Sequence, residues 1–172
     1  MALGTVINST RRNLALLGVR ALLGAVLIAH GWQKYNDWGV DATRSNFSDM
    51  GIPHAGPAAA FAIAAELGGG VLLLLGLLTP LASLAVVANM AGAFWYAHRG
   101  TEIFVGKGGW ELVAMIGAAA LALFATGAGA LSLDALFVGS WRRRRARKAK
   151  LKPAKPAPTH NVLGEELAST SA

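Results

Sequence analysis

Three polar residues stand inside long apolar stretches of the chain, where a charged or amide side chain is costly. Arg20 lies ten residues before His30, and Glu66 and Asn89 each lie nine residues after the proline that opens their apolar stretch. At a helical rise of about 1.5 Å per residue, each is roughly 13–15 Å from a helix end, so adjacent helices would bring all three to one level. We therefore expect a buried Arg20–Glu66 ion pair, with Asn89 satisfying the remaining donors and acceptors.

Two interpretations of this polar cluster stay open. It is either a structural clasp that fixes the register of the helices, or the polar end of a pocket for a ligand that carries a carbonyl group or an anion. In the second case, Glu66 would also move protons, since ionisable groups inside apolar helices are candidates for function.

A second group of polar side chains falls where the apolar stretches end: His30, Lys34, His98 and Glu111. Histidine titrates near neutral pH, so a proton relay beside an open pocket is one interpretation, and ordinary interfacial histidines are the other. Two histidines and a carboxylate could also bind a metal or haem, but their spacing matches no ligand motif. We predict no metal site.

The composition indicates which solvent surrounds these helices. Hydrophobic residues make up 54% of the 172 residues and charged residues only 15%, against about a quarter in soluble domains, so we expect a membrane protein. The chain has no cysteine, which excludes disulfides, thiol redox chemistry and iron–sulfur clusters. The net charge is +7, and nine of the 16 basic residues lie between Arg142 and Lys155, a pattern that fits an anionic membrane surface better than nucleic acid.

The fold class predicted is all-α, a bundle of four transmembrane helices. The apolar stretches that are long enough to span a bilayer cover residues 13–30, 57–78, 80–97 and 111–131. Small residues recur every three or four positions on three of them, and such faces mark helix–helix contacts in membranes. The sets are Ala58, Ala62 and Gly70 with Glu66; Ala82, Ala85 and Ala93 with Asn89; and Ala114, Ala118, Ala122 and Thr126.

The positive charges predict how the chain is oriented. With four spans, eleven lysine and arginine residues fall on the side of the two termini and four on the opposite side, which places both termini in the cytoplasm of a bacterial inner membrane. We expect a cytoplasmic N-terminus over residues 1–12, a membrane domain over 13–137 and a basic, largely disordered tail over 138–172. A short interfacial helix should begin with Ser132 as its N-cap. The following Arg142, Arg143, Arg144 and Arg145 would bind anionic headgroups or act only as a topology anchor.

Several short motifs together resemble the DoxX family. They include His30-Gly-Trp-Gln-Lys34, Glu66-x-Gly-Gly, Gly109-Trp-Glu111-Leu and Ser132-Leu-Asp134, and the likeness runs in order from about residue 13 to 136. The resemblance implies a small four-helix inner-membrane protein, associated with a terminal quinol oxidase, with thiosulfate:quinone oxidoreduction or, in actinobacteria, with a membrane oxidoreductase complex. It also implies kinship with the quinone-linked oxidoreductases of disulfide formation, but those use cysteine pairs that this chain lacks.

The resulting functional hypothesis is a non-thiol accessory subunit of a quinone-linked membrane redox complex, with Arg20, Glu66 and Asn89 as the polar floor of a quinone-like site. His30 and Glu111 would be proton relays at its mouth. Whether the chain is itself catalytic stays open. One alternative is a scaffold without a ligand of its own, which recruits redox partner proteins through the basic tail. The other is a small-solute transporter, which the lack of an internal repeat disfavours.

Overall fold

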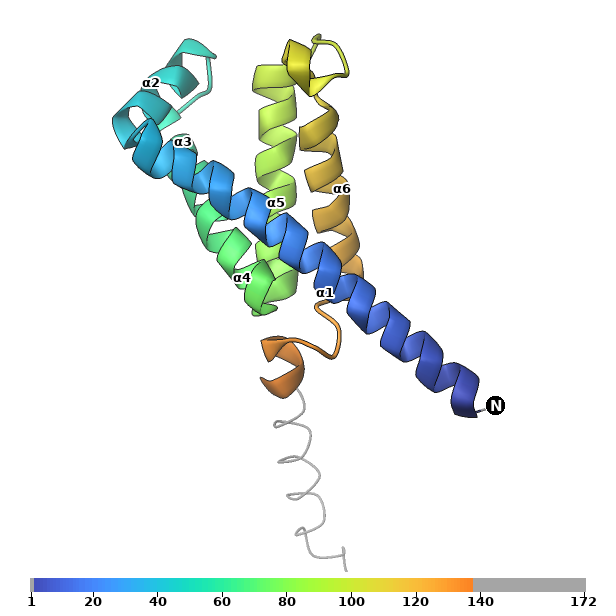
Figure 1. The fold of residues 1–172 in the computed structure, drawn as a ribbon. Coiled ribbons are helices and arrows are strands. Elements are labelled where there is room, and N and C mark those ends of the chain that lie inside the picture. The colour runs from blue at the N-terminus through green and yellow to red at the C-terminus, as the bar shows by residue number, and fades with distance from the viewer. Residues whose placement is uncertain (1, 138–172) are drawn as a thin grey trace, which may run out of the picture. The chain divides into compact units, whose positions relative to one another are not determined.

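The apolar stretches of the sequence form long helices that pack side by side (Figure 1). The computed structural model describes residues 2–137, and among these there is no β-strand, so the predicted all-α class is confirmed. The elements are α1 (Ala2–Trp32), η1 (Gln33–Asp37), α2 (Val40–Asp49), α3 (Ala55–Ile63), η2 (Ala64–Gly68), α4 (Gly69–Leu75), α5 (Thr79–Ala93), η3 (Phe94–His98), η4 (Val105–Lys107) and α6 (Glu111–Thr126). The end that carries α2 and η4 is called the upper end, as in Figure 1, and the end that carries residues 127–137 the lower end.

Three continuous helical stretches are long and apolar enough to cross a membrane: Ile7–Asp37, Ala55–Leu75 and Thr79–His98. The fourth, α6, has 16 residues and is about 24 Å long, shorter than a hydrocarbon core of about 30 Å. The prediction that this helix continues to residue 131 was wrong, because Gly127 adopts a φ of 73° and ends it. The first helix is longer than predicted, and α2 was not predicted.

The second and third spans are joined by a tight turn, as predicted, but the second span ends at Leu75 and not at Leu78, and Gly76 rather than Pro80 ends it. Gly76, with a φ of 66°, ends α4, and the amides of Gly76 and Leu77 donate back to the carbonyls of Leu73 and Leu72. This is the Schellman arrangement, which satisfies carbonyls that a helix end leaves free. Helix α5 then begins at Thr79, with Pro80 in its first turn.

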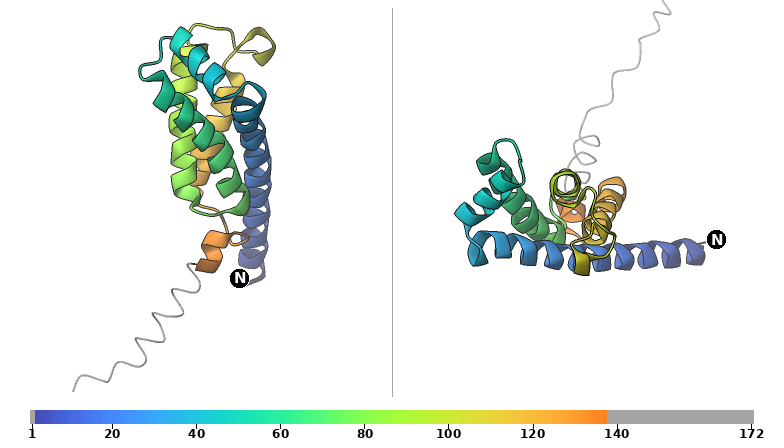
Figure 2. Two further views of the ribbon diagram at one scale, coloured as in Figure 1. Left: turned by 90° about the vertical axis from the view of Figure 1, so that its left-hand side faces the viewer. Right: turned by 90° about the horizontal axis from the view of Figure 1, so that it is seen from above.

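Helix α1 packs along one side of the others, and the view from above in Figure 2 shows it as a straight rod. Two glycines bring α1 close to α4. A Cβ on Gly24 would lie 2.8 Å from the Gly70 carbonyl oxygen, and one on Gly70 would lie 3.0 Å from the Gly24 oxygen. Nearer the upper end, a Cβ on Gly31 would lie 2.5 Å from the Leu67 amide nitrogen. Glycine is therefore required here for the helices to approach.

The apolar core is built from α1, α4, α5 and α6; its buried members are Leu23, Leu27, Leu73, Ala82, Val86, Met90, Ile116, Ala120 and Leu123. The two helix faces of small residues that contain Glu66 and Asn89 point into the bundle, as predicted. The one predicted for α6 does not: Ala114, Ala118, Ala122 and Thr126 are exposed. Helix α6 instead buries the face that carries Ile116, Ala120 and Leu123.

A short helical turn at residues 133–137 follows at the lower end. The predicted cap is confirmed, because the Ser132 hydroxyl accepts the Ala135 amide at 3.2 Å. Both Asp134 carboxylate oxygens accept amides from the start of α5, Leu78 at 2.8 Å and Thr79 at 2.9 Å. The predicted headgroup-binding residues Arg142–Arg145 lie outside the described residues.

Candidate ligand pocket

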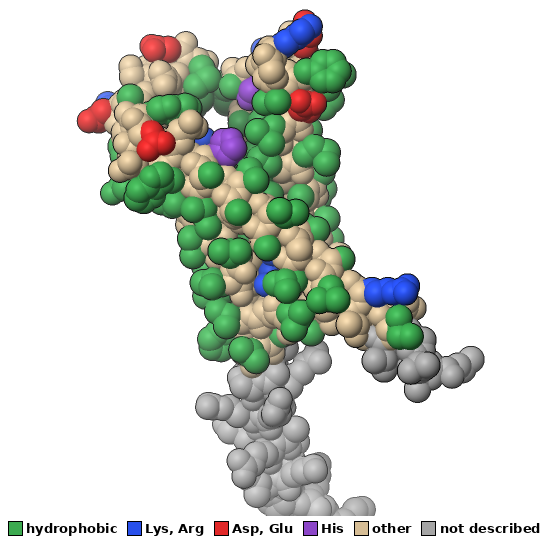
Figure 3. All heavy atoms as spheres, viewed as in Figure 1, with side chains coloured by type: hydrophobic (Ala, Val, Ile, Leu, Met, Phe, Trp, Pro, Cys, Tyr) green, Lys and Arg blue, Asp and Glu red, His purple; other side chains and the backbone are tan. Residues whose placement is uncertain are grey.

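A cavity of about 490 Å³ lies toward the upper end and is lined mainly by apolar side chains. Every helical stretch from α1 to α6 except α4 contributes to its wall. Figure 3 shows the hollow between the α2–α3 side and the α5–α6 side of the molecule, with histidine side chains at its margin. Its polar lining residues are His30, Lys34, Glu66, Asn89, Tyr96 and His98. Five of these six residues were sequence candidates, and Tyr96 was not.

Three π-helical segments surround this pocket, and each supplies a polar side chain to it: η1 carries Lys34, η2 carries Glu66 and η3 carries His98. A π-turn inserts one residue into an α-helix and rotates the side chains that follow, and such turns are frequent at functional sites. The spacing of apolar residues along the sequence does not show where a π-turn occurs, so the sequence did not predict these three segments. Their coincidence on three helices around one cavity marks the upper end as the candidate site.

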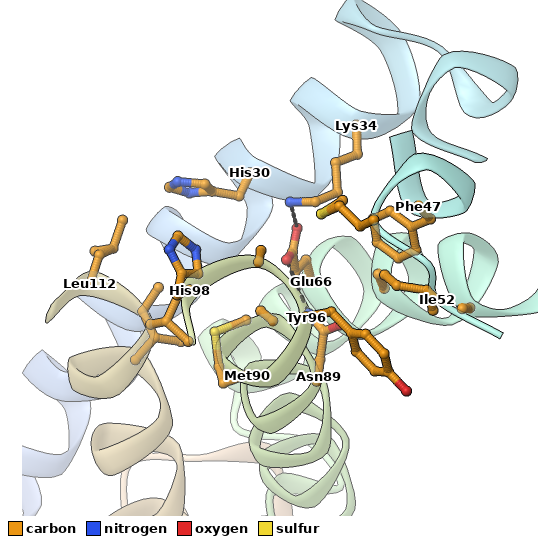
Figure 4. Close-up of a pocket in the computed structure, with 18 of the residues that line it drawn as sticks. His30, Lys34, Phe47, Ile52, Glu66, Asn89, Met90, Tyr96, His98 and Leu112 are labelled. Atoms are coloured by element: carbon orange, nitrogen blue, oxygen red, sulfur yellow. Dashed lines mark hydrogen bonds and ion pairs between the residues drawn. The ribbon is translucent and has the colours of Figure 1, made fainter. Parts of the chain in front are cut away.

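The central polar contact in the pocket is an ion pair between Lys34 of η1, which continues α1, and Glu66 of η2, which continues α3. The Lys34 ammonium donates to Glu66 Oε2 at 2.6 Å, and the Asn89 amide donates to Glu66 Oε1 at 3.0 Å (Figure 4). The side chains of Lys34 and Glu66 are only 15% and 6% exposed. Both carboxylate oxygens are therefore occupied. An ammonium has three N–H donors, and among the described residues Glu66 is its one hydrogen-bond acceptor, so Lys34 keeps donors for a ligand.

The two histidines have one ring nitrogen committed and one available. His30 Nδ1 lies 2.9 Å from the Val26 carbonyl oxygen, and His98 Nδ1 lies 2.9 Å from that of Gly108. A carbonyl only accepts, so Nδ1 carries the proton in each ring. In a neutral imidazole Nε2 is then an acceptor, which can take a proton from a ligand hydroxyl in the pocket.

The prediction that Arg20 pairs with Glu66 was wrong. Arg20, only 1% exposed, donates from Nε to the Leu73 carbonyl at 3.1 Å and from its two terminal nitrogens to the carbonyls of Ala128 and Leu131 at the lower end. Counting residues along each helix placed the backbone of Arg20 at mid-depth, but its long side chain reaches carbonyl oxygens at the ends of α4 and of the segment after α6. Carbonyl oxygens near helix ends are good acceptors for a guanidinium, because each oxygen has two lone pairs and at most one backbone amide donates to it here.

Glu111 is not part of the pocket lining either. Its carboxylate accepts the Val105 amide at 2.8 Å and so holds the loop that precedes α6. The same loop contains an exposed Lys107–Glu102 ion pair at 2.8 Å. Of the two residues predicted as proton relays at the mouth, His30 lines the pocket and Glu111 does not; the candidate His98 also lines it. The cation that Glu66 requires is Lys34, which the sequence placed only at the rim.

The geometry defines an all-α membrane protein with a polar ion pair inside an apolar pocket. Two family models match the chain: the one described as DoxX matches residues 15–99, and the one described as TQO small subunit DoxD matches residues 59–154. The chain therefore belongs to the DoxX family of membrane proteins, as its motifs predict. The overlap of the two matches, residues 59–99, includes Glu66, Asn89 and His98. Neither a curated protein nor a solved structure matches the chain.

Proposed function

We propose that this protein is a non-thiol accessory subunit of a quinone-linked membrane redox complex, and that the upper pocket binds a quinone-like head group. Two findings support the proposal. Membership of a family linked to subunits of thiosulfate:quinone oxidoreductase gives the class of reaction. The Lys34–Glu66 pair inside a predominantly apolar pocket gives the chemistry, and it is the observation that carries the proposal.

The residues present fit such a head group. The cavity of about 490 Å³ falls within the roughly 300–1,000 Å³ typical of small-molecule sites, which combine an apolar wall with a few polar groups. A ring with a carbonyl oxygen would accept a hydrogen bond from the free N–H groups of Lys34. Aromatic walls from Trp38, Phe47 and Tyr96 would flank the ring.

A bound quinone would supply two-electron, two-proton chemistry. The protein's own part would be to orient the head group and to handle protons. Glu66 holds the Lys34 ammonium in the pocket, where its remaining N–H groups could bind a carbonyl oxygen. Nε2 of His30 and of His98 would accept or return the protons. With no cysteine in the chain, thiols play no part in electron transfer, and a partner protein would deliver the electrons.

The test is binding of a decyl-substituted 1,4-benzoquinone to the purified protein in lipid nanodiscs, followed by quenching of tryptophan fluorescence. Glu66→Gln removes the charge that holds Lys34, so we expect at least tenfold weaker binding by a folded protein. The matched control is Glu102→Gln, because Glu102 is an exposed carboxylate that also pairs with a lysine but lies outside the pocket. Unchanged quinone affinity in folded Glu66→Gln would contradict the proposal. Loss of folding in Glu66→Gln would instead favour the structural clasp.

An unbiased check uses the protein as purified. Extraction of its bound lipids, followed by chromatography and an absorbance spectrum, should yield a quinone in amounts that fall in Glu66→Gln and persist in Glu102→Gln. A quinone content equal to that of the surrounding membrane lipid in all three proteins would argue against a dedicated site.

We further propose that the lower end faces the cytoplasm of a bacterial inner membrane, where the basic residues at both termini would meet anionic headgroups. The support is the charge asymmetry of the sequence, because Arg11, Arg12 and the nine basic residues after Trp141 all belong to the terminal side. A fluorescent protein fused after residue 172 should fold and fluoresce in cells, and an alkaline phosphatase fused there should be inactive. The opposite pair of results would reverse the orientation.

A further inference from the structure

The pocket reaches the surface between α3 and α5, and the residues at this opening are apolar or aromatic. On one side lies Phe61 of α3, 48% exposed. On the other, Ala88, Gly92 and Tyr96 follow one another at four-residue intervals along α5 and η3. Ala88 is exposed and Tyr96 is 40% exposed although both line the cavity. The same residues thus belong to the pocket wall and to the outer surface.

This opening lies alongside a spanning helix and not beyond its end. Gly92 is six residues before His98, the end of the stretch Thr79–His98, so it lies about 9 Å along the helix from that end. On the same helix, Leu84 and Phe94 are 51% and 40% exposed, as expected of a surface in contact with lipid chains. The polar groups of the pocket, Lys34, Glu66 and Asn89, are half-buried or buried behind the opening.

We propose that the gap between α3 and α5 is a lateral portal through which the apolar tail of an amphipathic ligand passes into the bilayer. The polar head would lie at Lys34 and Glu66, and the tail would pass between Phe61 and Gly92. The substrate class is therefore a ring head group with a long alkyl or isoprenoid chain, in contrast to a water-soluble solute that enters from the upper end. The nature of the head rests on the proposed function, whereas the portal rests on the exposure of the lining residues.

Gly92 gives a precise means of closing the portal. A Cβ built on Gly92 would meet no atom within 4 Å, so a larger side chain can be introduced there without a clash with the protein backbone. A tryptophan at this position would project into the opening that the tail needs. The matched control is Leu84→Trp, which adds the same side chain to an exposed site on the same helix that does not line the pocket.

The experiment compares tail-less and decyl-substituted 1,4-benzoquinone in nanodiscs containing wild type, Gly92→Trp or Leu84→Trp. We expect Gly92→Trp to weaken binding of the decyl compound at least tenfold and that of the tail-less compound less than twofold, with Leu84→Trp like wild type for both. Partition of each compound into the bilayer is the same for all three proteins, so it cancels in the comparison. Equal weakening of both compounds, or of neither, overturns the portal.

A second measurement keeps the portal testable if no quinone binds, a result that would contradict the proposed function alone. Because the chain has no cysteine, Gly92→Cys and Leu84→Cys each carry one site for a nitroxide label. In nanodiscs, a label at a lipid-facing portal should relax with dissolved oxygen and not with a water-soluble nickel chelate, as should the Leu84 label. Stronger relaxation by nickel than by oxygen at position 92 would show an aqueous opening and overturn the portal.

Discussion

Replacing Lys34 by methionine tests whether the ion pair in the upper pocket has the energetics that its geometry implies. At 2.6 Å and an effective dielectric constant of about 20, the attraction between the two charges is about 6 kcal/mol before desolvation is counted. Removing one partner of a buried pair leaves the other charge stranded, which costs about 3–5 kcal/mol in measured cases. Methionine keeps most of the length of the lysine side chain, so the apolar packing is largely retained.

Lys34→Met leaves the Glu66 carboxylate without its cation. We therefore expect the variant to lose about 3–5 kcal/mol of unfolding free energy at pH 7.

The assay is reversible unfolding in mixed micelles by titration with SDS at pH 7. The double variant Lys34→Met/Glu66→Gln removes both charges and should recover most of the loss at pH 7, because no charge is left stranded. Lys107→Met is the matched control, since Lys107 forms an ion pair with Glu102 that is largely exposed and worth little. If Lys34→Met unfolds like wild type at pH 7, the carboxylate is better solvated than the structure indicates.

Three further predictions concern the packing and the lower end, and each is checked by the same SDS titration. Arg20→Lys keeps the charge but cannot reach three separate carbonyls, so we expect a loss of about 2–3 kcal/mol, and wild-type stability would contradict that role. Gly31→Ala places a Cβ 2.5 Å from the Leu67 amide and should cost more than 2 kcal/mol, whereas Gly68→Ala, with open space at its Cβ, should be neutral or stabilising by up to about 1 kcal/mol. Asp134→Ala removes both acceptors at the start of α5 and should cost about 1–2 kcal/mol; a smaller effect than that of an exposed Asp49→Ala control would be inconsistent with capping.

The helices could be predicted from the sequence because the signals are local. Apolar length gave the positions of the spans, and the residues around Thr79-Pro80 gave the turn between α4 and α5, since proline and glycine act on the backbone at their own position. The end of α6 was missed because the apolar composition continues past Gly127, where the backbone turns. Local composition thus predicts where a helix can exist better than where it stops.

The partner of Glu66 could not be predicted in the same way, because it depends on three-dimensional details. Counting residues along each helix placed Arg20 and Glu66 at one depth. This count ignores the reach of a long side chain and the carbonyl oxygens at helix ends that can accept its hydrogen bonds. It also assumes regular α-helices, whereas Lys34 and Glu66 lie in the π-turns η1 and η2, which change the direction of the side chains. The residue types needed for the pocket were recognised, and the pairing among them was not.

The two polar clusters differ in their access to a cavity: Arg20 is buried and does not line the pocket, whereas Lys34, His30 and His98 do. This difference separates a structural role from a binding role. At the lower end, every guanidinium nitrogen of Arg20 donates to a carbonyl and both oxygens of Asp134 accept amides. Such a cluster lowers the energy of the fold and offers little to a ligand. In the upper pocket, Lys34 has donors to spare within the described part of the chain, and two histidines each keep one ring nitrogen for another partner. Polar groups inside an apolar wall that are only partly satisfied cost stability, and a protein retains that cost where a ligand completes the hydrogen bonds.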